Sequence, residues 1–324
     1  MSNAKIIAML AVAILMIAAP AALADDYPSR PVKLIVPFAP GGTTDIIARI
    51  VSQKIGTAFG QPMIVENRSG AGGVIGANDT ATALPDGYSL GVATVSTTAT
   101  APVMQPNVPY DPITDFTPII NIAATPNVIE VNPSFPARDF NSFIAELKKN
   151  PDKYSYASPG PGSITHMQME LFKARTGVSI VHIPYKGAGP ALNDVVGGHV
   201  LVMFDNLPSS LPFIQQGKLI PIAVAADKRV PSLPNVPTLK ELGLTEVNRM
   251  AYYGIYGPKG LSVETVTKVH DAVKKTLEDS QVRARIEETG SVIIANSPSE
   301  FAAQIKAEYE TYKRLAHEQN LKSE

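Results

Sequence analysis

Short β-rich runs alternate with helical patterns along almost the whole of this 324-residue chain. Several runs are apolar on successive residues, as strands covered on both faces of a sheet require. Between them, apolar residues such as Ile46, Ile50 and Val51 recur at helical spacing. This alternation predicts an α/β fold with mostly parallel sheets. The clearest predicted strands are 33–38, 63–67, 89–94, 127–131, 180–185, 200–205 and 219–225. The last 65 residues are predicted to be mainly helical, with helices at 263–277, 281–289 and 298–317 and one strand at 291–295.

Two stretches of the sequence suit a crossing between lobes. A proline-dotted segment from Pro102 to Pro118 leads into an apolar run at 119–124, and the run at 219–225 precedes a second proline-rich segment at 230–237. Two such connections make a hinge. We therefore expect a discontinuous first lobe, 25–123 plus 226–324, and a continuous second lobe, 124–225.

The first 24 residues have the pattern of a signal peptide. Lys5 is followed by an apolar run at 6–17, and Ala22 and Ala24 supply the small residues that a signal peptidase needs. The run is too short to span a membrane comfortably. We expect cleavage after Ala24 and export to the periplasm.

Composition excludes several classes of function. The chain has no cysteine, which rules out disulfides, thiol nucleophiles and thiolate metal sites. It has 28 Lys and Arg residues against 29 Asp and Glu residues, and the leader removes only Lys5, so the mature net charge is about −2. This balance does not favour a polyanion partner, and we expect no binding to nucleic acid.

Common enzyme motifs are missing. The glycines at 70–76 resemble a dinucleotide fingerprint, but the third glycine falls one residue late. No G-x-S-x-G, Walker lysine loop or H-E-x-x-H occurs, and the five histidines lack metal-ligand spacing. We therefore expect no cofactor, no metal and no catalytic residues.

Four glycine- or serine-rich loops follow predicted strands and precede predicted helices, at 37–45, 157–166, 185–190 and 205–210. Glycine lets the backbone approach a ligand closely, and the free N–H groups of a helix N-terminus favour an anion. Any one of these loops alone is weak evidence, because ordinary strand-to-helix turns are common in α/β folds. Together, at the carboxyl ends of strands in two lobes, they indicate an anion-binding cleft.

Two residues in these loops permit two interpretations each. His166, in the first turn of a predicted helix, either caps the loop or contacts the ligand. Asp45 either faces the ligand or complements the helix dipole, and Arg49 lies one turn later, where it can pair with Asp45.

Motifs spread over the chain resemble those of the tripartite tricarboxylate transporter receptors, also called Bug-type solute-binding proteins. They are VPFAPGG at 36–42, ENR at 66–68, GAGG at 70–73, PDGY at 85–88, YDP at 110–112, PYKG at 184–187, FDN at 204–206 and PNVPT at 234–238. The resemblance implies a two-lobed type II periplasmic binding-protein fold that closes over a small organic carboxylate and presents it to a membrane permease.

The same resemblance implies a pocket in which backbone amides, hydroxyls and ordered water hold the carboxylate. Carried over by matching loops, the expected ligand-binding residues are Phe38, Ala39, Gly41, Gly42, Thr43, Ser96, Thr97, Ser158, Gly162, Ser163, His166, Lys186, Gly187, Ala188 and Asp205. One segment departs from the family pattern, because Tyr252, Tyr253 and Tyr256 stand where many relatives carry a tryptophan. The identity of the carboxylate therefore stays open.

These observations predict a monomeric, non-enzymatic receptor for a small organic carboxylate. One alternative is a receptor that presents the ligand to a sensor protein instead of a permease. The other is an exported α/β enzyme that uses His166 and an aspartate as acid and base, although the usual nucleophile motifs are missing.

Overall fold

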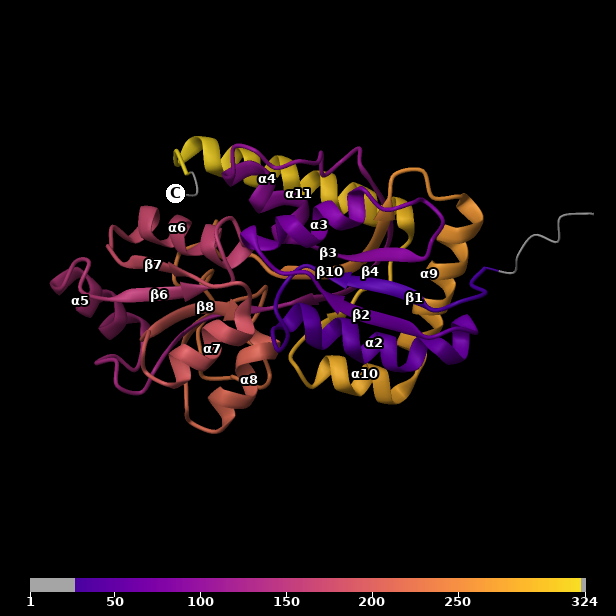
Figure 1. Ribbon diagram of the computed structural model, residues 1–324. Helices are drawn as coiled ribbons and strands as arrows, with labels where there is room; N and C mark the ends of the chain where they lie inside the picture. The colour runs from indigo at the N-terminus through magenta and orange to yellow at the C-terminus, as the bar shows by residue number, and fades with distance from the viewer. Residues whose placement is uncertain (1–26, 322–324) are drawn as a thin grey trace, which may run out of the picture.

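A computed structural model describes residues 27–321, so the predicted leader and its cleavage site lie outside the described residues. The chain forms two lobes, each built on one twisted sheet with helices on both faces (Figure 1). This arrangement confirms the predicted two-lobed α/β fold.

The first lobe contains a six-stranded sheet in the order β11-β4-β10-β3-β1-β2. Its strands are β1 (Val32–Val36), β2 (Met63–Asn67), β3 (Ser89–Thr94), β4 (Phe116–Thr125), β10 (Ala251–Pro258) and β11 (Val292–Ile293). Its helices are α2 (Thr43–Phe59), α3 (Val74–Ala81), α4 (Ala101–Met104), α9 (Val263–Glu278), α10 (Ser280–Glu287) and α11 (Pro298–Glu318), with a 3₁₀ turn at Ala71–Gly73 and a π-helix at Ser96–Thr100.

The second lobe contains a five-stranded sheet in the order β7-β6-β8-β5-β9. Its strands are β5 (Asn127–Val131), β6 (Ser155–Ser158), β7 (Val181–Pro184), β8 (Val202–Asn206) and β9 (Ile220–Ala225). Its helices are α5 (Phe140–Lys149), α6 (Ile164–Thr176), α7 (Ala188–Val196) and α8 (Leu207–Gln215).

Both sheets are mixed, whereas the sequence predicts mostly parallel ones. Strand β1 pairs in parallel with β2 and β3, and β6 pairs in parallel with β7 and β8. Four antiparallel pairs involve β10 or β5, which lie beside the crossings between the lobes, and the short strand β11 pairs antiparallel with β4. A chain that enters a lobe from its neighbour runs against the strands already there, and for this reason each sheet acquires an antiparallel part.

The two crossings differ in form. Strand β4 of the first lobe continues into β5 of the second across the single residue Pro126. After β9, the return segment first packs on the second lobe, where Val224 N–H donates to Pro237 O (3.0 Å) and Leu239 N–H donates to Val224 O (2.8 Å). The chain therefore returns to the first lobe near Arg249, later than the boundary expected at 225/226.

Buried side chains explain the position of the central strand β10. All eight of its residues are buried, between β3 and β4, and Tyr252, Tyr253 and Tyr256 are among the largest fully buried side chains. Helix α11 packs over this strand, with the Phe301 ring against Tyr252 at a centroid distance of 5.6 Å. Ser297 and Glu300 form a capping box at the start of α11, and Pro298 occupies the first turn of this helix.

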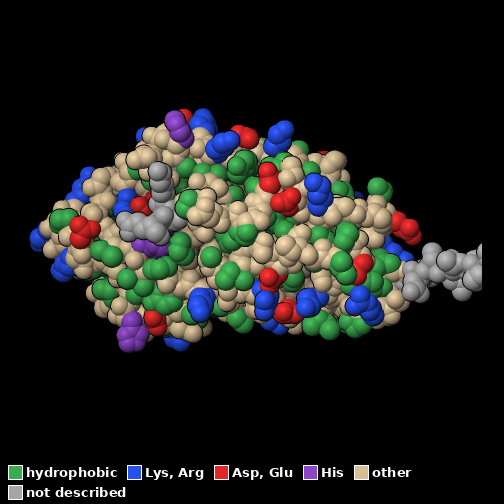
Figure 2. All heavy atoms as spheres, turned by 45° about the horizontal axis from the view of Figure 1, so that its top comes forward, with side chains coloured by type: hydrophobic (Ala, Val, Ile, Leu, Met, Phe, Trp, Pro, Cys, Tyr) green, Lys and Arg blue, Asp and Glu red, His purple; other side chains and the backbone are tan. Residues whose placement is uncertain are grey.

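The surface carries charges of both signs. On the face in Figure 2, Lys and Arg side chains lie interspersed with Asp and Glu rather than gathered into one patch. Within residues 27–321, no helix combines the length and the apolar character needed to cross a membrane.

Candidate functional site

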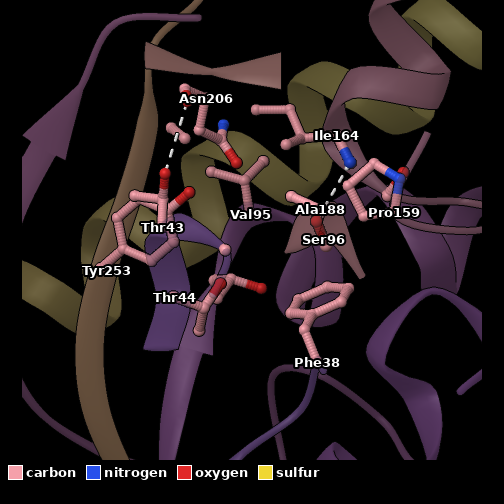
Figure 3. A pocket seen from close by; sticks show the side chains of 14 residues that line it. Phe38, Thr43, Thr44, Val95, Ser96, Pro159, Ile164, Ala188, Asn206 and Tyr253 are labelled. Atoms are coloured by element: carbon pink, nitrogen blue, oxygen red, sulfur yellow. Dashed lines mark hydrogen bonds between the residues drawn. The ribbon is translucent and has the colours of Figure 1, made fainter. Parts of the chain in front are cut away.

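A small cavity lies between the two lobes, with about 20 Å³ of space for the centre of a water molecule. None of the lining residues is an acid, a lysine, an arginine or a histidine, so the polar groups that face the cavity are neutral. Figure 3 shows Phe38 and Asn206 on opposite sides of it, with Tyr253 on one flank. The lining residues are Phe38, Gly42, Thr43, Thr44, Thr94, Val95, Ser96, Pro159, Ser163, Ile164, Ala188, Asn206, Ala251 and Tyr253.

The loop from β1 to α2 forms one wall of the cavity. Gly41 adopts a positive φ of 89°, and its N–H donates to Asp45 Oδ2 (3.1 Å). Gly42 is the N-cap of α2 and offers no capping side chain, so the N–H groups of the first turn stay available. Burial alone would raise the pKa of Asp45, but hydrogen bonds from Arg49, Asn67 and Gly41 lower it overall. Asp45 therefore remains ionised and holds the loop in shape.

The loop from β6 to α6 forms part of the facing wall. Ser163 is the N-cap of α6, and its Oγ accepts from His166 N–H (3.4 Å). His166 Nδ1 accepts the N–H of Gly162 (3.0 Å). His166 therefore caps the loop and turns its ring away from the interlobe cavity.

The loops before α7 and α8 complete the site. A Cβ added to Gly187 would come within 2.7 Å of Ala39 N, and one added to Gly42 would lie 3.1 Å from Ala188 Cβ. Glycine at both positions allows the backbones of the two lobes to approach closely. On the remaining side, Asn206 ends β8 and lines the cavity.

Hydrogen bonds join the loops of one lobe to those of the other. Ala39 N–H donates to Lys186 O (3.0 Å), Ile164 N–H to Ser96 Oγ (3.0 Å) and Thr100 Oγ1 to Gly162 O (2.7 Å). Thr43 Oγ1 and Ser209 Oγ lie 2.9 Å apart. These contacts connect the lobes directly, so the structure shows the closed form.

The expected ligand-binding residues fall into two groups. Six of them line the cavity, namely Phe38, Gly42, Thr43, Ser96, Ser163 and Ala188. The other nine do not line it. Ala39, Gly41, Gly162, Lys186 and Gly187 shape the loops through their backbone, and Thr97, Ser158, His166 and Asp205 direct their side chains to other partners.

The remaining lining residues were not among the expected set. Five of them directly adjoin expected residues along the chain, and the sixth, Thr94, lies two residues before Ser96, so an expected set drawn from slightly longer loop segments would have included all six. The six are Thr44, Thr94, Val95, Pro159, Ile164 and Asn206. Ala251 and Tyr253 come from strand β10, which is distant in the sequence and contains none of the loop motifs used for the prediction. The signal for Tyr253 was the departure from the tryptophan-containing segment.

Two histidine rings stack in the second lobe, next to the loop from β6 to α6. His166 and His182 have ring centroids 4.0 Å apart, and His182 Nε2 lies 2.6 Å from Ser158 Oγ. Burial lowers the pKa of His166 to about 4, with a smaller contribution from Lys173. Burial and the neighbouring His166 lower the pKa of His182 to about 3. Both rings are therefore neutral at neutral pH.

We expect mild acid to destabilise the second lobe through this pair. An unfolded histidine titrates near pH 6.5, so the stability from the neutral rings is complete above that pH and is lost as the pH falls toward about 4 and then 3. Thermal unfolding at pH 7 and about pH 5.5 measures the loss before most carboxylates titrate. Replacing His166 with asparagine keeps an acceptor for Gly162 N–H and should flatten the dependence. An equal change in melting temperature between the two pH values in the wild type and in His166→Asn would contradict the assignment.

The fold and the site define a class of protein, the two-lobed α/β binding proteins that enclose a small molecule between their lobes. Within this class, residues 47–321 match the model of the tripartite tricarboxylate transporter family receptor. The match covers most of the chain, which therefore belongs to this family of solute-binding receptors.

Similar proteins support the assignment. The chain is 34% identical to Protein BugT of Bordetella pertussis over 307 residues, 94% of both chains. It is similar to a solved structure described as a periplasmic transporter, with 50% identity and a TM-score of 0.90 over 91% of this chain and 99% of that one. It is also similar to R. palustris Rpa4515 with adipate, with 34% identity and a TM-score of 0.88 over 92% and 99% of the two chains.

Proposed function

We propose that this protein is a periplasmic receptor that captures a small organic carboxylate between its lobes and delivers it to the membrane permease of a tripartite tricarboxylate transporter. The observation that carries the proposal is the neutral interlobe cavity at the N-termini of helices from both lobes. Membership of a receptor family and a relative solved with adipate support the carboxylate class.

Helix N-termini and hydroxyls supply the binding energy in this proposal. Thr43 and Thr44 begin α2 and Ala188 begins α7, and the first-turn N–H groups of a helix have no partner within the helix. Such groups and the helix dipole stabilise an anion without a charged side chain. Ser96 and Ser163 add hydroxyls from opposite lobes. We propose that Asp205, which does not line the cavity, acts on the site indirectly.

In this proposal the two lobes close because the ligand must contact both walls of the cavity at once. A carboxylate held by donors from both lobes favours the closed form by its differential affinity for that form. The lining offers no general base or nucleophile apart from hydroxyls, so we propose binding without catalysis. The mechanism needs only one chain, and we propose that the receptor acts as a monomer.

A thermal-shift screen of the mature protein tests the proposal. We expect compact mono- and dicarboxylates, adipate among them, to raise the melting temperature, since a ligand at 100 times its Kd adds about 2.7 kcal/mol. The amide of each acid is the matched control, because it keeps the size but lacks the charge. Stabilisation by sugars or amines but by no carboxylate would overturn the proposal.

A further inference from the structure

Two carboxyl groups lie buried together in the second lobe. Glu130 on β5 and Asp205 on β8 each have an exposed fraction of 0%, and no Lys, Arg or His of residues 27–321 forms an ion pair with either carboxyl. Strands β5, β8 and β9 and helix α8 carry no other charged side chain. On the adjacent helices, Asp194 accepts a hydrogen bond from Tyr185, Asp45 pairs with Arg49, and Glu170 of α6 is bound by Lys173. Tyr253 of β10 also lies near enough for the charge of Asp205 to raise the pKa of its hydroxyl.

One hydroxyl joins the two carboxyl groups. Ser210 Oγ lies 2.7 Å from Glu130 Oε1 and 2.9 Å from Asp205 Oδ2. A serine hydroxyl has a single proton to donate. With both carboxyls ionised, one of these short contacts would bring two unprotonated oxygens together, so the geometry requires a proton on one carboxyl.

Asp205 is the better anion of the two. Its Oδ2 accepts from Ser209 Oγ (2.6 Å) as well as from Ser210. Among residues 27–321, Glu130 accepts only from Ser210, whereas Asp205 accepts from two hydroxyls; each carboxyl keeps one further oxygen, Glu130 Oε2 and Asp205 Oδ1, buried without a hydrogen bond. Burial, and then the charge of Asp205, raise the pKa of Glu130 well above its ordinary value.

The same chain of hydroxyls reaches the wall of the cavity. If Ser209 Oγ donates to Asp205, its contact with Thr43 Oγ1 (2.9 Å) requires Thr43 to donate, and Thr43 Oγ1 in turn accepts Ser209 N–H (3.2 Å). Thr43 belongs to the other lobe and lines the cavity. The charge state of the carboxyl pair therefore sets the orientation of a hydroxyl at the site.

We propose that Glu130 keeps a proton at neutral pH and that the resulting pair, with a single negative charge on Asp205, positions Ser209 and Thr43 to hold the lobes together. Glu130 and Asp205 are thus positioning residues. The link to ligand capture rests on the function proposed above, whereas the proton on Glu130 does not depend on any ligand.

Infrared spectroscopy of the mature protein without added carboxylate tests the proton directly. We expect a carboxylic-acid C=O band at pH 7 in the wild type and its loss in Glu130→Gln. Glu170→Gln is the matched control, because Glu170 is a glutamate of the same lobe whose two oxygens are bound by Lys173, and the band should persist there. A wild type without the band, or a band that survives Glu130→Gln, would overturn the proposal even if a carboxylate ligand is found.

The pH dependence of unfolding provides a second readout. A carboxyl whose pKa is raised by folding stabilises the protein below the unfolded value of 4.5, and this stabilisation is lost as pH rises toward the raised pKa. With one retained proton, the folding equilibrium constant should fall about tenfold per pH unit above pH 7, where the histidines no longer titrate. Glu130→Gln, which retains a donor toward Ser210, should remove this slope. Glu130→Leu, which has no such donor, should be less stable than the wild type. Equal slopes in the wild type and Glu130→Gln would count against the retained proton.

Discussion

Replacing Gly189 with alanine is expected to prevent ligand capture while leaving the fold intact. Gly189 lies in the first turn of α7 at an ordinary helical φ, where alanine improves helix propensity by up to about 1 kcal/mol. A Cβ at this position would, however, lie 2.1 Å from Pro40 O of the other lobe. The clash exists only when the lobes meet, so the substitution penalises closure and not folding.

The size of the effect follows from the rigidity of both partners. Pro40 O and the first turn of α7 are backbone, so neither can move aside as a flexible side chain would. We expect closure to lose at least about 3 kcal/mol, which corresponds to roughly a 100-fold weaker Kd for the carboxylate identified by screening. Calorimetric titration measures the affinity, and thermal unfolding without ligand measures the stability of the fold.

Gly56→Ala is the matched control. Gly56 also lies in a helix, α2, but its added Cβ would find its nearest neighbour, Gln61 O, at 3.6 Å. We expect a small gain in stability and unchanged affinity. If Gly189→Ala binds as tightly as the wild type, the closed arrangement of the loops is not the one that holds the ligand.

Much of the fold was predictable because buried strands leave a strong pattern of apolar residues in the sequence. The predicted strands 63–67, 89–94 and 127–131 coincide with β2, β3 and β5, and the last helix begins at Pro298 as predicted. The central strand β10 was not predicted as a strand. Its glycines and tyrosines give no alternating pattern, since both faces are covered, and Gly254 is required where a Cβ would lie 2.4 Å from the Phe301 ring.

The site was predictable as a set of loops but less so residue by residue. Loop glycines indicate where the chain bends, but they do not determine which side chain points into the cavity. His166 illustrates the limit, because its ring is engaged by Gly162 N–H and His182 and so faces away from the cavity. Asp205 is similar, since Ser209 and Ser210 bind its carboxylate beneath the site. Such choices depend on partners far away in the sequence.

A buried network of amides connects the cavity to the hinge. Asn206, which lines the cavity, donates from Nδ2 to Asn127 Oδ1, and Asn127 Nδ2 donates to Gln168 Oε1 (2.6 Å). Gln168 Nε2 then donates to the carbonyls of Val247 and Arg249, each at 2.9 Å, where the chain returns to the first lobe. Gln168 is fully buried in α6, so no water replaces a bond that is lost.

Replacing Gln168 with methionine is therefore expected to be among the most destabilising single changes in the chain. Methionine nearly preserves the volume and the helix propensity, but it leaves Val247 O and Asn127 Nδ2 without this partner. At roughly 1–3 kcal/mol for each unsatisfied group, we expect a loss of about 3 kcal/mol in the free energy of unfolding, measured by urea denaturation.

Gln53→Met is the matched control for the same chemical change on an exposed helical surface. Gln53 Oε1 accepts one exposed hydrogen bond, from Arg285, so its loss should change stability by no more than about 0.5 kcal/mol. Because Gln168 reaches both the hinge carbonyls and, through Asn127, a residue of the cavity wall, its replacement should also weaken carboxylate binding. Equal stability of the two variants would show that the amide network contributes little, and that packing alone holds the return segment against the second lobe.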